Sequence, residues 1–165
     1  MAVLAGYGFG LCEDYTNPDP YRNPQGLTTP FLMVYYTASM VEVIHADMQD
    51  AYCMMDITRN DFGLGHDALY DNPDVDYYWA VVRDTILEPL LFGSYNKPTK
   101  AILFGECSRD EQFRHVLDDV LKEYYRQHMP IIYTDDPLFV GARGVAKFVR
   151  RAPYRPRPRK SFLLI

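Results

Sequence analysis

Runs of apolar and aromatic residues in the first third of the chain follow the two-residue period of β-strands. Residues 31–36 are apolar or aromatic throughout, and residues 40–45 place Glu42 between Val41 and Val43. A period of two is typical of strands, because successive side chains point to opposite faces of a sheet. The pattern predicts two strands here and a third over residues 51–57. Short connections favour an antiparallel meander.

The second half of the chain has the three-to-four-residue spacing of amphipathic helices. One helix is predicted over residues 74–92, with an acid at its start and Pro89 near its end. Because proline disrupts helical hydrogen bonding, we expect a kink in the last turn or an end near Glu88. A second helix is predicted to begin after Ser108 or Asp110, the two candidate N-caps, and to reach Tyr125.

Short buried strands are predicted before and after this second helix. The first of these strands covers residues 100–104 and is followed by Gly105. The second covers residues 131–133 and precedes a third helix. That helix is expected to begin at Pro137, behind Asp135 or Asp136 as its cap, and to run to about residue 151. A face of small residues should let it lie close against the sheet; these residues are Gly141, Ala142, Gly144, Val145 and Ala146. The predicted fold class is α/β, with a mixed sheet of about five strands and packed helices.

Charge is distributed unevenly along the chain. The formal net charge is −5, but six of the seventeen basic residues lie between Arg150 and Lys160. The rest of the chain therefore carries eleven basic and 22 acidic residues, a net −11. We expect residues 1–151 to form a single domain and residues 152–165 to be a basic, Pro/Arg-rich flexible tail. An acidic domain argues against broad phosphate-backbone binding, so only the tail is expected to bind nucleic acid or an acidic surface.

Other motifs mostly narrow the range of functions. Cys12, Cys53 and Cys107 lack metal-ligand or redox spacing, and the four histidines are scattered, so no metal site is predicted. The glycines at positions 6, 8 and 10 favour a turn or a close helix crossing over a phosphate cradle, because the lysine of a P-loop is absent. No apolar run is long enough for a membrane span, and we expect a cytoplasmic protein.

Cys107 also lies beside a predicted helix N-terminus, a location that lowers a thiol pKa and can make it reactive. No histidine is near it in sequence to act as a base.

Four segments, taken in order, carry a resemblance to a known family. They are residues 5–12 (AGYGFGLC), the strand pair within 31–45, residues 101–110 (AILFGECSRD) and residues 135–146 (DDPLFVGARGVA). Together they resemble landmarks of the second lobe of the 70-kDa heat-shock chaperone ATPase domain, and more narrowly the divergent chaperone-like proteins of filamentous fungi. The resemblance covers about residues 2–151. It implies half of an actin-like ATPase, or ribonuclease H-like, fold.

The resemblance also identifies a candidate nucleotide site. Residues 34–39 (VYYTAS) match the family's phosphate turn, yet they contain no glycine and no carboxylate. The family's adenosine-binding turn is matched more closely than its phosphate turn, because Gly105, Ser108 and Arg109 correspond to it. Glu106, however, replaces a glycine of the family. Asp136 matches a position near the adenine pocket. The resemblance therefore implies weak binding of ATP or ADP, with Mg²⁺ only as a companion of the nucleotide.

Three functions follow as expectations. The first is a non-catalytic remnant of a chaperone-like ATPase that offers a protein-interaction or weak adenine-nucleotide-binding surface. In that case a protein partner, or a second copy of the chain, would cover the face that the first lobe covers in the family. The second is an ATP-binding chaperone-like protein completed by a lobe from another chain. The third is binding of RNA or acidic surfaces through the tail.

Overall fold

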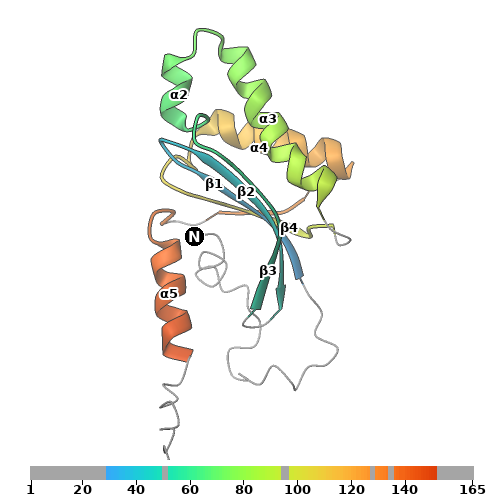
Figure 1. Cartoon of the computed structure of the whole chain (residues 1–165), viewed down its shortest axis with the longest axis vertical. Coiled ribbons are helices and arrows are strands. Elements are labelled where there is room, and N and C mark those ends of the chain that lie inside the picture. The colour runs from blue at the N-terminus through green and yellow to red at the C-terminus, as the bar shows by residue number, and fades with distance from the viewer. Residues whose placement is uncertain (1–28, 50–51, 94–96, 127–128, 134–135, 152–165) are drawn as a thin grey trace, which may run out of the picture.

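The structure, a computed structural model, describes residues 29–49, 52–93, 97–126, 129–133 and 136–151. Its strands are β1 (Thr29–Tyr36), β2 (Val41–Gln49), β3 (Tyr52–Asp61), β4 (Lys100–Phe104) and β5 (Ile131–Ile132). Its helices are α2 (His66–Asp71), α3 (Val75–Phe92), α4 (Glu111–Tyr125) and α5 (Val140–Arg151). Figure 1 shows α2 and α3 at one end of the molecule and α5 at the other.

The strands form one mixed sheet in the order β3-β2-β1-β4-β5. The first three pair antiparallel through short connections, and β4 then lies parallel to β1, with β5 parallel to β4 at the edge. This arrangement confirms the predicted meander and the α/β class with a mixed five-stranded sheet. The strand over residues 100–104 has the predicted bounds, whereas β2 and β3 are longer than the sequence pattern indicated.

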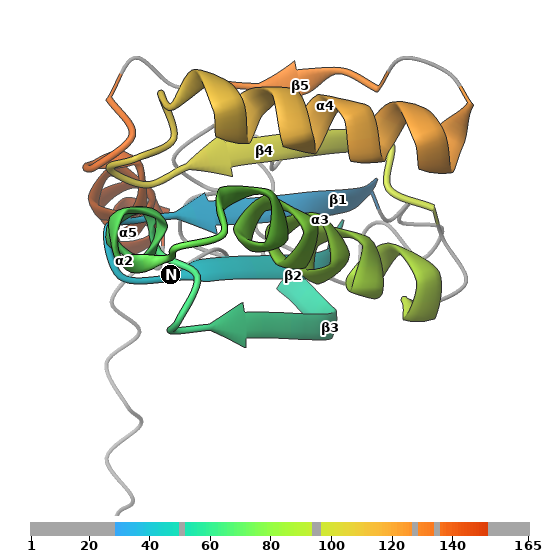
Figure 2. The same ribbon diagram turned by 90° about the horizontal axis from the view of Figure 1, so that it is seen from above.

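Helices α3 and α4 cover one face of the sheet (Figure 2). The main hydrophobic core lies between the helices and the sheet. Its members include Leu32, Val34, Tyr36, Val43, Tyr78, Val82, Ile86, Leu103, Phe113 and Leu117. Every one of these side chains is almost completely removed from water. Apolar burial of this kind is the main driving force for folding.

Both long helices begin at aspartate caps. Asp74 accepts a hydrogen bond from the N–H of Tyr77 at 2.9 Å, and Asp110 accepts one from the N–H of Phe113 at 2.7 Å. Each carboxylate satisfies an N–H group that has no partner within the helix. Of the two candidate caps for the second helix, the structure selects Asp110.

Of the two alternatives expected at Pro89, an end of the helix near Glu88 is wrong, and the predicted extent to residue 92 is confirmed. The helix continues to Phe92, and the carbonyl of Pro89 accepts the N–H of Gly93 at 2.9 Å. Pro89 is buried, so it packs into the core as an apolar side chain. Because tertiary packing overrides local propensity, a proline is retained inside the last turns of this helix.

Two further details differ from the sequence-based expectation. The third strand extends to Asp61, beyond the predicted end at residue 57, and the short helix α2 begins at His66, where the patterns predicted no element. The third helix begins at Val140, because Pro137 lies in a turn before it. On α5, Gly141 and Gly144 are buried while Ala142, Val145 and Ala146 are exposed, so the five small residues do not form one packed face.

Several expectations concern residues outside the described ranges. These are the glycines at positions 6, 8 and 10, the resemblance of residues 5–12 and the character of residues 152–165. Among the described residues, none of the helices combines the length and the apolar character that crossing a lipid bilayer requires.

Candidate functional site

The carboxyl ends of β1 and β4 lie side by side and mark the candidate site. From β1 the chain turns to β2 on one side of the sheet, whereas from β4 it proceeds through α4 to β5 on the other. Open α/β sheets bind ligands at such a switch point, because the two connections diverge there. The turn of residues 37–40 and the turn of residues 105–110 meet at this position.

The first turn, at the end of β1, satisfies its own backbone groups. The hydroxyl of Thr37 lies 3.3 Å from the N–H of Ser39 and 3.1 Å from that of Met40, and accepts from both. The N–H of Ala38 donates to the Oε1 atom of Glu106 at 2.8 Å. This turn therefore has no backbone N–H directed at an external anion, in agreement with the absence of glycine from residues 34–39.

Helix α2 closes the same turn from another side. The N–H groups of His66 and Asp67 donate to the carbonyls of Thr37 and Ala38, each at 2.9 Å. A Cβ atom added at Gly65 would come within 2.2 Å of the Ala38 carbonyl oxygen. Residue 65 must therefore be glycine if α2 is to approach the turn this closely.

Gly105 is the residue that lets β4 end beside β1. Its φ of 107° lies in a region that residues with a side chain rarely adopt. A Cβ atom here would come within 2.2 Å of the Tyr36 carbonyl oxygen. The N–H of Gly105 is directed at the carbonyl of Pro137 at 3.4 Å, which brings the segment before α5 to the same place.

The five residues expected at a nucleotide site thus come from two segments that the fold brings together. Gly105, Glu106, Ser108 and Arg109 share one turn, and Asp136 adjoins the Pro137 carbonyl that Gly105 contacts. Arg109 and Glu106 are exposed, whereas Ser108 is only 3% exposed. The Ser108 side chain is therefore enclosed by the turn, and its backbone carbonyl accepts the Nε–H of Arg114 at 2.8 Å.

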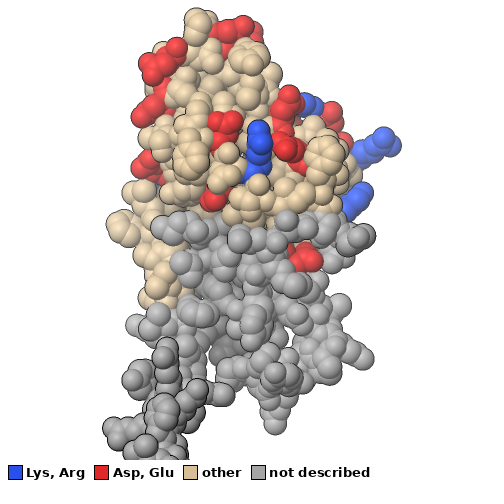
Figure 3. Space-filling view, viewed as in Figure 1, with Lys and Arg blue, Asp and Glu red and all other residues tan. Residues whose placement is uncertain are grey.

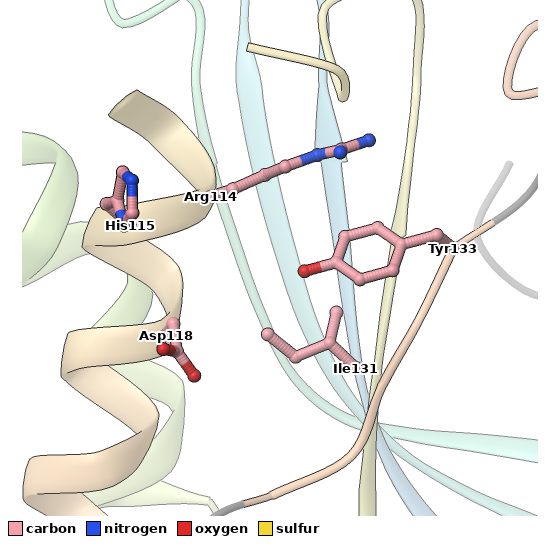
Figure 4. Close-up of a pocket in the computed structure, with 5 residues that line it drawn as sticks. All are labelled: Arg114, His115, Asp118, Ile131 and Tyr133. Atoms are coloured by element: carbon pink, nitrogen blue, oxygen red, sulfur yellow. The ribbon is translucent and has the colours of Figure 1, made fainter. Parts of the chain in front are cut away.

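A cavity of about 320 Å³ lies beside this turn, between α4 and β5. It is lined by Arg114, His115, Asp118, Ile131 and Tyr133, as Figure 4 shows. The guanidinium carbon of Arg114 lies 4.6 Å from the centroid of the Tyr133 ring, a cation–π arrangement. Burial raises the pKa of Tyr133, and the nearby Arg114 opposes that rise.

Sequence reasoning did not identify this cavity. Arg114 and Asp118 occupy polar positions of an amphipathic helix, where exposure to solvent is the ordinary explanation. Tyr133 follows a two-residue strand and carries no local signal. Only the position of β5 against α4 brings the two sides together.

The location of Cys107 beside the start of a helix does not lower the pKa of its thiol. Burial, followed by the charges of Glu106, Asp67 and Asp110, raises the pKa of this thiol to about 11. The thiol is protonated at neutral pH, and the thiolate is the form that acts as a nucleophile. The N–H of Cys107 instead has a structural role, donating to the Tyr36 carbonyl at 3.2 Å.

The charges around Tyr35, near the carboxyl end of β1, are negative. The pKa of Tyr35 is raised by burial and then by the charges of Glu106 and Glu42. Within the residues that the structure describes, no three His, Cys, Asp or Glu side chains converge as a metal site would require.

The chain matches no known protein-family model and no curated protein. Its function must therefore be inferred from the geometry of its own residues.

Proposed function

We propose that this chain is a ribonuclease H-like lobe of the actin-like ATPase kind that does not catalyse hydrolysis and binds adenine compounds weakly, through the base. The strand order supports the fold assignment. An antiparallel meander followed by two parallel strands, with β1 between β2 and β4, forms a mixed five-stranded sheet of the kind that the resemblance implies. The retained Gly105, Ser108 and Arg109 support the assignment of the base-binding turn.

The contact between Glu106 and Ala38 carries the proposal. The carboxylate accepts the backbone N–H of Ala38 at 2.8 Å, in the turn that the resemblance assigns to phosphate binding. A carboxylate there uses the donor that a phosphate would need, and its negative charge repels a phosphate at short range. Glu106 therefore acts as an internal substitute for the ligand's anion.

Exposed and stacking side chains lie at the base end of the site. Arg109 is exposed on the same turn, and Arg114 is stacked on Tyr133 at the neighbouring cavity. Guanidinium planes and aromatic rings both stack on purines, while a carboxylate such as Asp118 accepts hydrogen bonds from an amino group. A volume of about 320 Å³ is near the lower end of the range for small-molecule sites, which suits a base or nucleoside.

This arrangement predicts an unusual order of affinities. Adenosine should bind at least as tightly as ADP, ADP at least as tightly as ATP, and Mg²⁺ should add nothing, because the phosphates gain no contact. Titration calorimetry of the full chain with adenosine, ADP and ATP, with and without Mg²⁺, measures this order. Arg109→Ala and Arg114→Ala should each weaken adenosine binding by about tenfold or more, the loss of one stacking or charge contact.

Arg59→Ala is the matched control, since Arg59 is an exposed arginine on β3 paired with Glu88. It should leave adenosine binding unchanged. Glu106→Gln should reduce the penalty for phosphates and bring ADP closer to adenosine. ATP binding that is tighter than adenosine binding and depends on Mg²⁺, or hydrolysis that Arg109→Ala abolishes, would contradict the proposal.

A second candidate function is completion of the site by a protein partner. Tyr133, Leu138 and Phe139 are 45%, 62% and 59% exposed and flank the segment that meets Gly105. Large apolar side chains exposed beside a ligand site favour an interaction surface. In this case affinity purification with this chain as bait would recover a partner only in the presence of nucleotide. The double variant Leu138→Ser, Phe139→Ser would abolish recovery of the partner while preserving adenosine binding.

A further inference from the structure

An exposed aromatic surface covers the end of the molecule formed by α2, the loop after it and the first turn of α3. Its central side chains are Tyr70 and Tyr77, which are 75% and 63% exposed, together with Val75 at 49%. We call this surface, which spans residues 67–77, the α2–α3 face. Aromatic side chains gathered in this way are typical of interaction surfaces, because their exposure to water is unfavourable.

The α2–α3 face is also strongly acidic. The face contains four aspartates, namely Asp67, Asp71, Asp74 and Asp76, and residues 60–82 contain no lysine or arginine. Figure 3 shows acidic side chains gathered over this end of the molecule, with basic ones lower down. Among the described residues, Asp67, Asp71, Asp74 and Asp76 enter no ion pair with a basic side chain. The surface therefore suits a partner that offers several positive charges and can stack on tyrosine.

We propose that the α2–α3 face binds the basic segment of residues 150–160 of a second copy of this chain. That segment, RRAPYRPRPRK, contains six Lys or Arg residues and no acid. Arginine both pairs with carboxylates and stacks on aromatic rings, so it matches a surface that carries both aspartate and tyrosine side chains. The rest of the chain has a net charge of −11, so it favours association with this segment at long range.

The direction of α5 favours binding between copies over binding within one. Figure 1 shows α5 leading the chain away from the end that carries α2 and α3. Each copy then offers one face and one segment, so the contact joins copies head to tail and can repeat along an open chain.

Complementary variants test this inference on the full chain. The face variant carries Tyr70→Ala, Asp71→Asn, Asp76→Asn and Tyr77→Ala, which leaves the capping carboxylate of Asp74 in place. The segment variant carries Arg155→Gln, Arg157→Gln and Arg159→Gln. Sedimentation velocity at about 50 mM NaCl should show concentration-dependent oligomers for the unchanged chain and monomers for each variant alone.

An equimolar mixture of the two variants is the decisive sample. Only one face and one segment remain functional in it, so it should form a one-to-one dimer and nothing larger. Association of the unchanged chain should weaken at least about tenfold when NaCl is raised from about 50 to about 500 mM, because surface charges are screened. A synthetic peptide of residues 150–160 should dissociate the oligomers, a readout that does not depend on any variant folding.

A variant with Asp84→Asn and Asp119→Asn controls for the loss of acidic charge elsewhere, since both residues are exposed. It should associate as the unchanged chain does. The inference is overturned if the unchanged chain is monomeric at low salt. A monomer would also be the result if the segment bound the face of its own copy, and that result overturns the inference as well. It is also overturned if the segment variant alone associates normally or if the mixture of variants stays monomeric.

Discussion

The hydroxyl groups of Tyr36 and Tyr78 meet at 3.2 Å in the interior of the protein and join β1 to α3. The hydroxyl of Tyr78 also lies 3.1 Å from the carbonyl oxygens of Leu64 and Gly65, before α2. Because a hydroxyl has one proton, Tyr78 donates to these carbonyls and accepts from Tyr36. Burial raises the pKa of both hydroxyls, so the pair stays neutral. The ring of Tyr36 in turn stacks on Phe113 of α4, at a centroid distance of 3.9 Å.

Removing the Tyr78 hydroxyl should cost more than removing that of Tyr36. Tyr78→Phe leaves two buried carbonyls without their donor and Tyr36 without its acceptor, which should lower the free energy of unfolding by about 1–3 kcal/mol. Tyr36→Phe removes one donor to Tyr78 and should cost about 0.5–1.5 kcal/mol. Urea unfolding of the two variants measures both values. Equal losses, or the reverse order, would contradict the assigned direction of these hydrogen bonds.

Gly105→Ala should destabilise the protein strongly. The φ of 107° is unfavourable for alanine, and the new Cβ would lie 2.2 Å from the Tyr36 carbonyl oxygen, a backbone atom that cannot move aside easily. We expect a loss of more than about 2 kcal/mol in the free energy of unfolding. Gly63→Ala is the control, because its closest contact is the flexible Asp61 side chain at 3.3 Å. Its effect should stay within about 0.5 kcal/mol.

The Cys107 thiol should react slowly with iodoacetamide at neutral pH. Its pKa is raised from 9.0 to about 11, so the thiolate accumulates only near pH 11. In a chain with Cys12→Ser and Cys53→Ser, the alkylation rate of the folded protein should rise up to about pH 11, and that of the urea-unfolded protein should level off near pH 9. A folded rate that levels off below pH 9 would show that the thiol is activated.

The raised pKa of Cys107 should also make the free energy of unfolding depend on pH at alkaline pH. Between the two pKa values the folded state holds the proton more often than the unfolded state does, so the stability that Cys107 contributes is present below about pH 9 and is lost as the pH rises towards about 11. Cys107→Ala should reduce this alkaline loss, measured by urea unfolding across that range. An unchanged pH dependence would mean that another group is responsible.

The cap of α4 should depend on an acceptor oxygen and not on charge. Asp110 accepts the N–H of Phe113 at 2.7 Å. Asp110→Ala should lower the free energy of unfolding by about 0.5–2 kcal/mol, while Asp110→Asn should keep most of the stability, because the amide oxygen can still accept. Asp119→Ala, on the exposed side of the same helix, serves as the comparison and should have little effect. If Asn and Ala were equally destabilising, the charge of Asp110 would be the important feature.

Local patterns predicted most of the elements. The meander, the strand that ends at Gly105 and the helix that ends at Tyr125 follow from periods of two and of three to four residues. The patterns were wrong where packing competed with local preference. Pro89 stays inside α3 because its side chain is buried, and the short helix α2 forms at residues 66–71, for which the patterns predicted no element.

The candidate site was predicted only in part. The turn from Gly105 to Arg109 follows a buried strand, a position that sequence reasoning can recognise. Nothing local indicates that the carboxylate of Glu106 caps the N–H of Ala38, since the two residues are 68 positions apart. The same is true of the stacking between Arg114 and Tyr133, which requires β5 to lie against α4.

The sequence by itself determined the order and type of the main elements, the glycine at the end of β4 and the separation of acidic and basic residues along the chain, because these depend on local backbone preferences and composition. Only the tertiary structure decided that the turns after β1 and β4 lie side by side and that the carboxylate of Glu106 accepts the backbone N–H of Ala38. It also decided that Cys107 is kept protonated. These outcomes depend on strand order and burial, which bring distant residues within a few ångströms and exclude water from them.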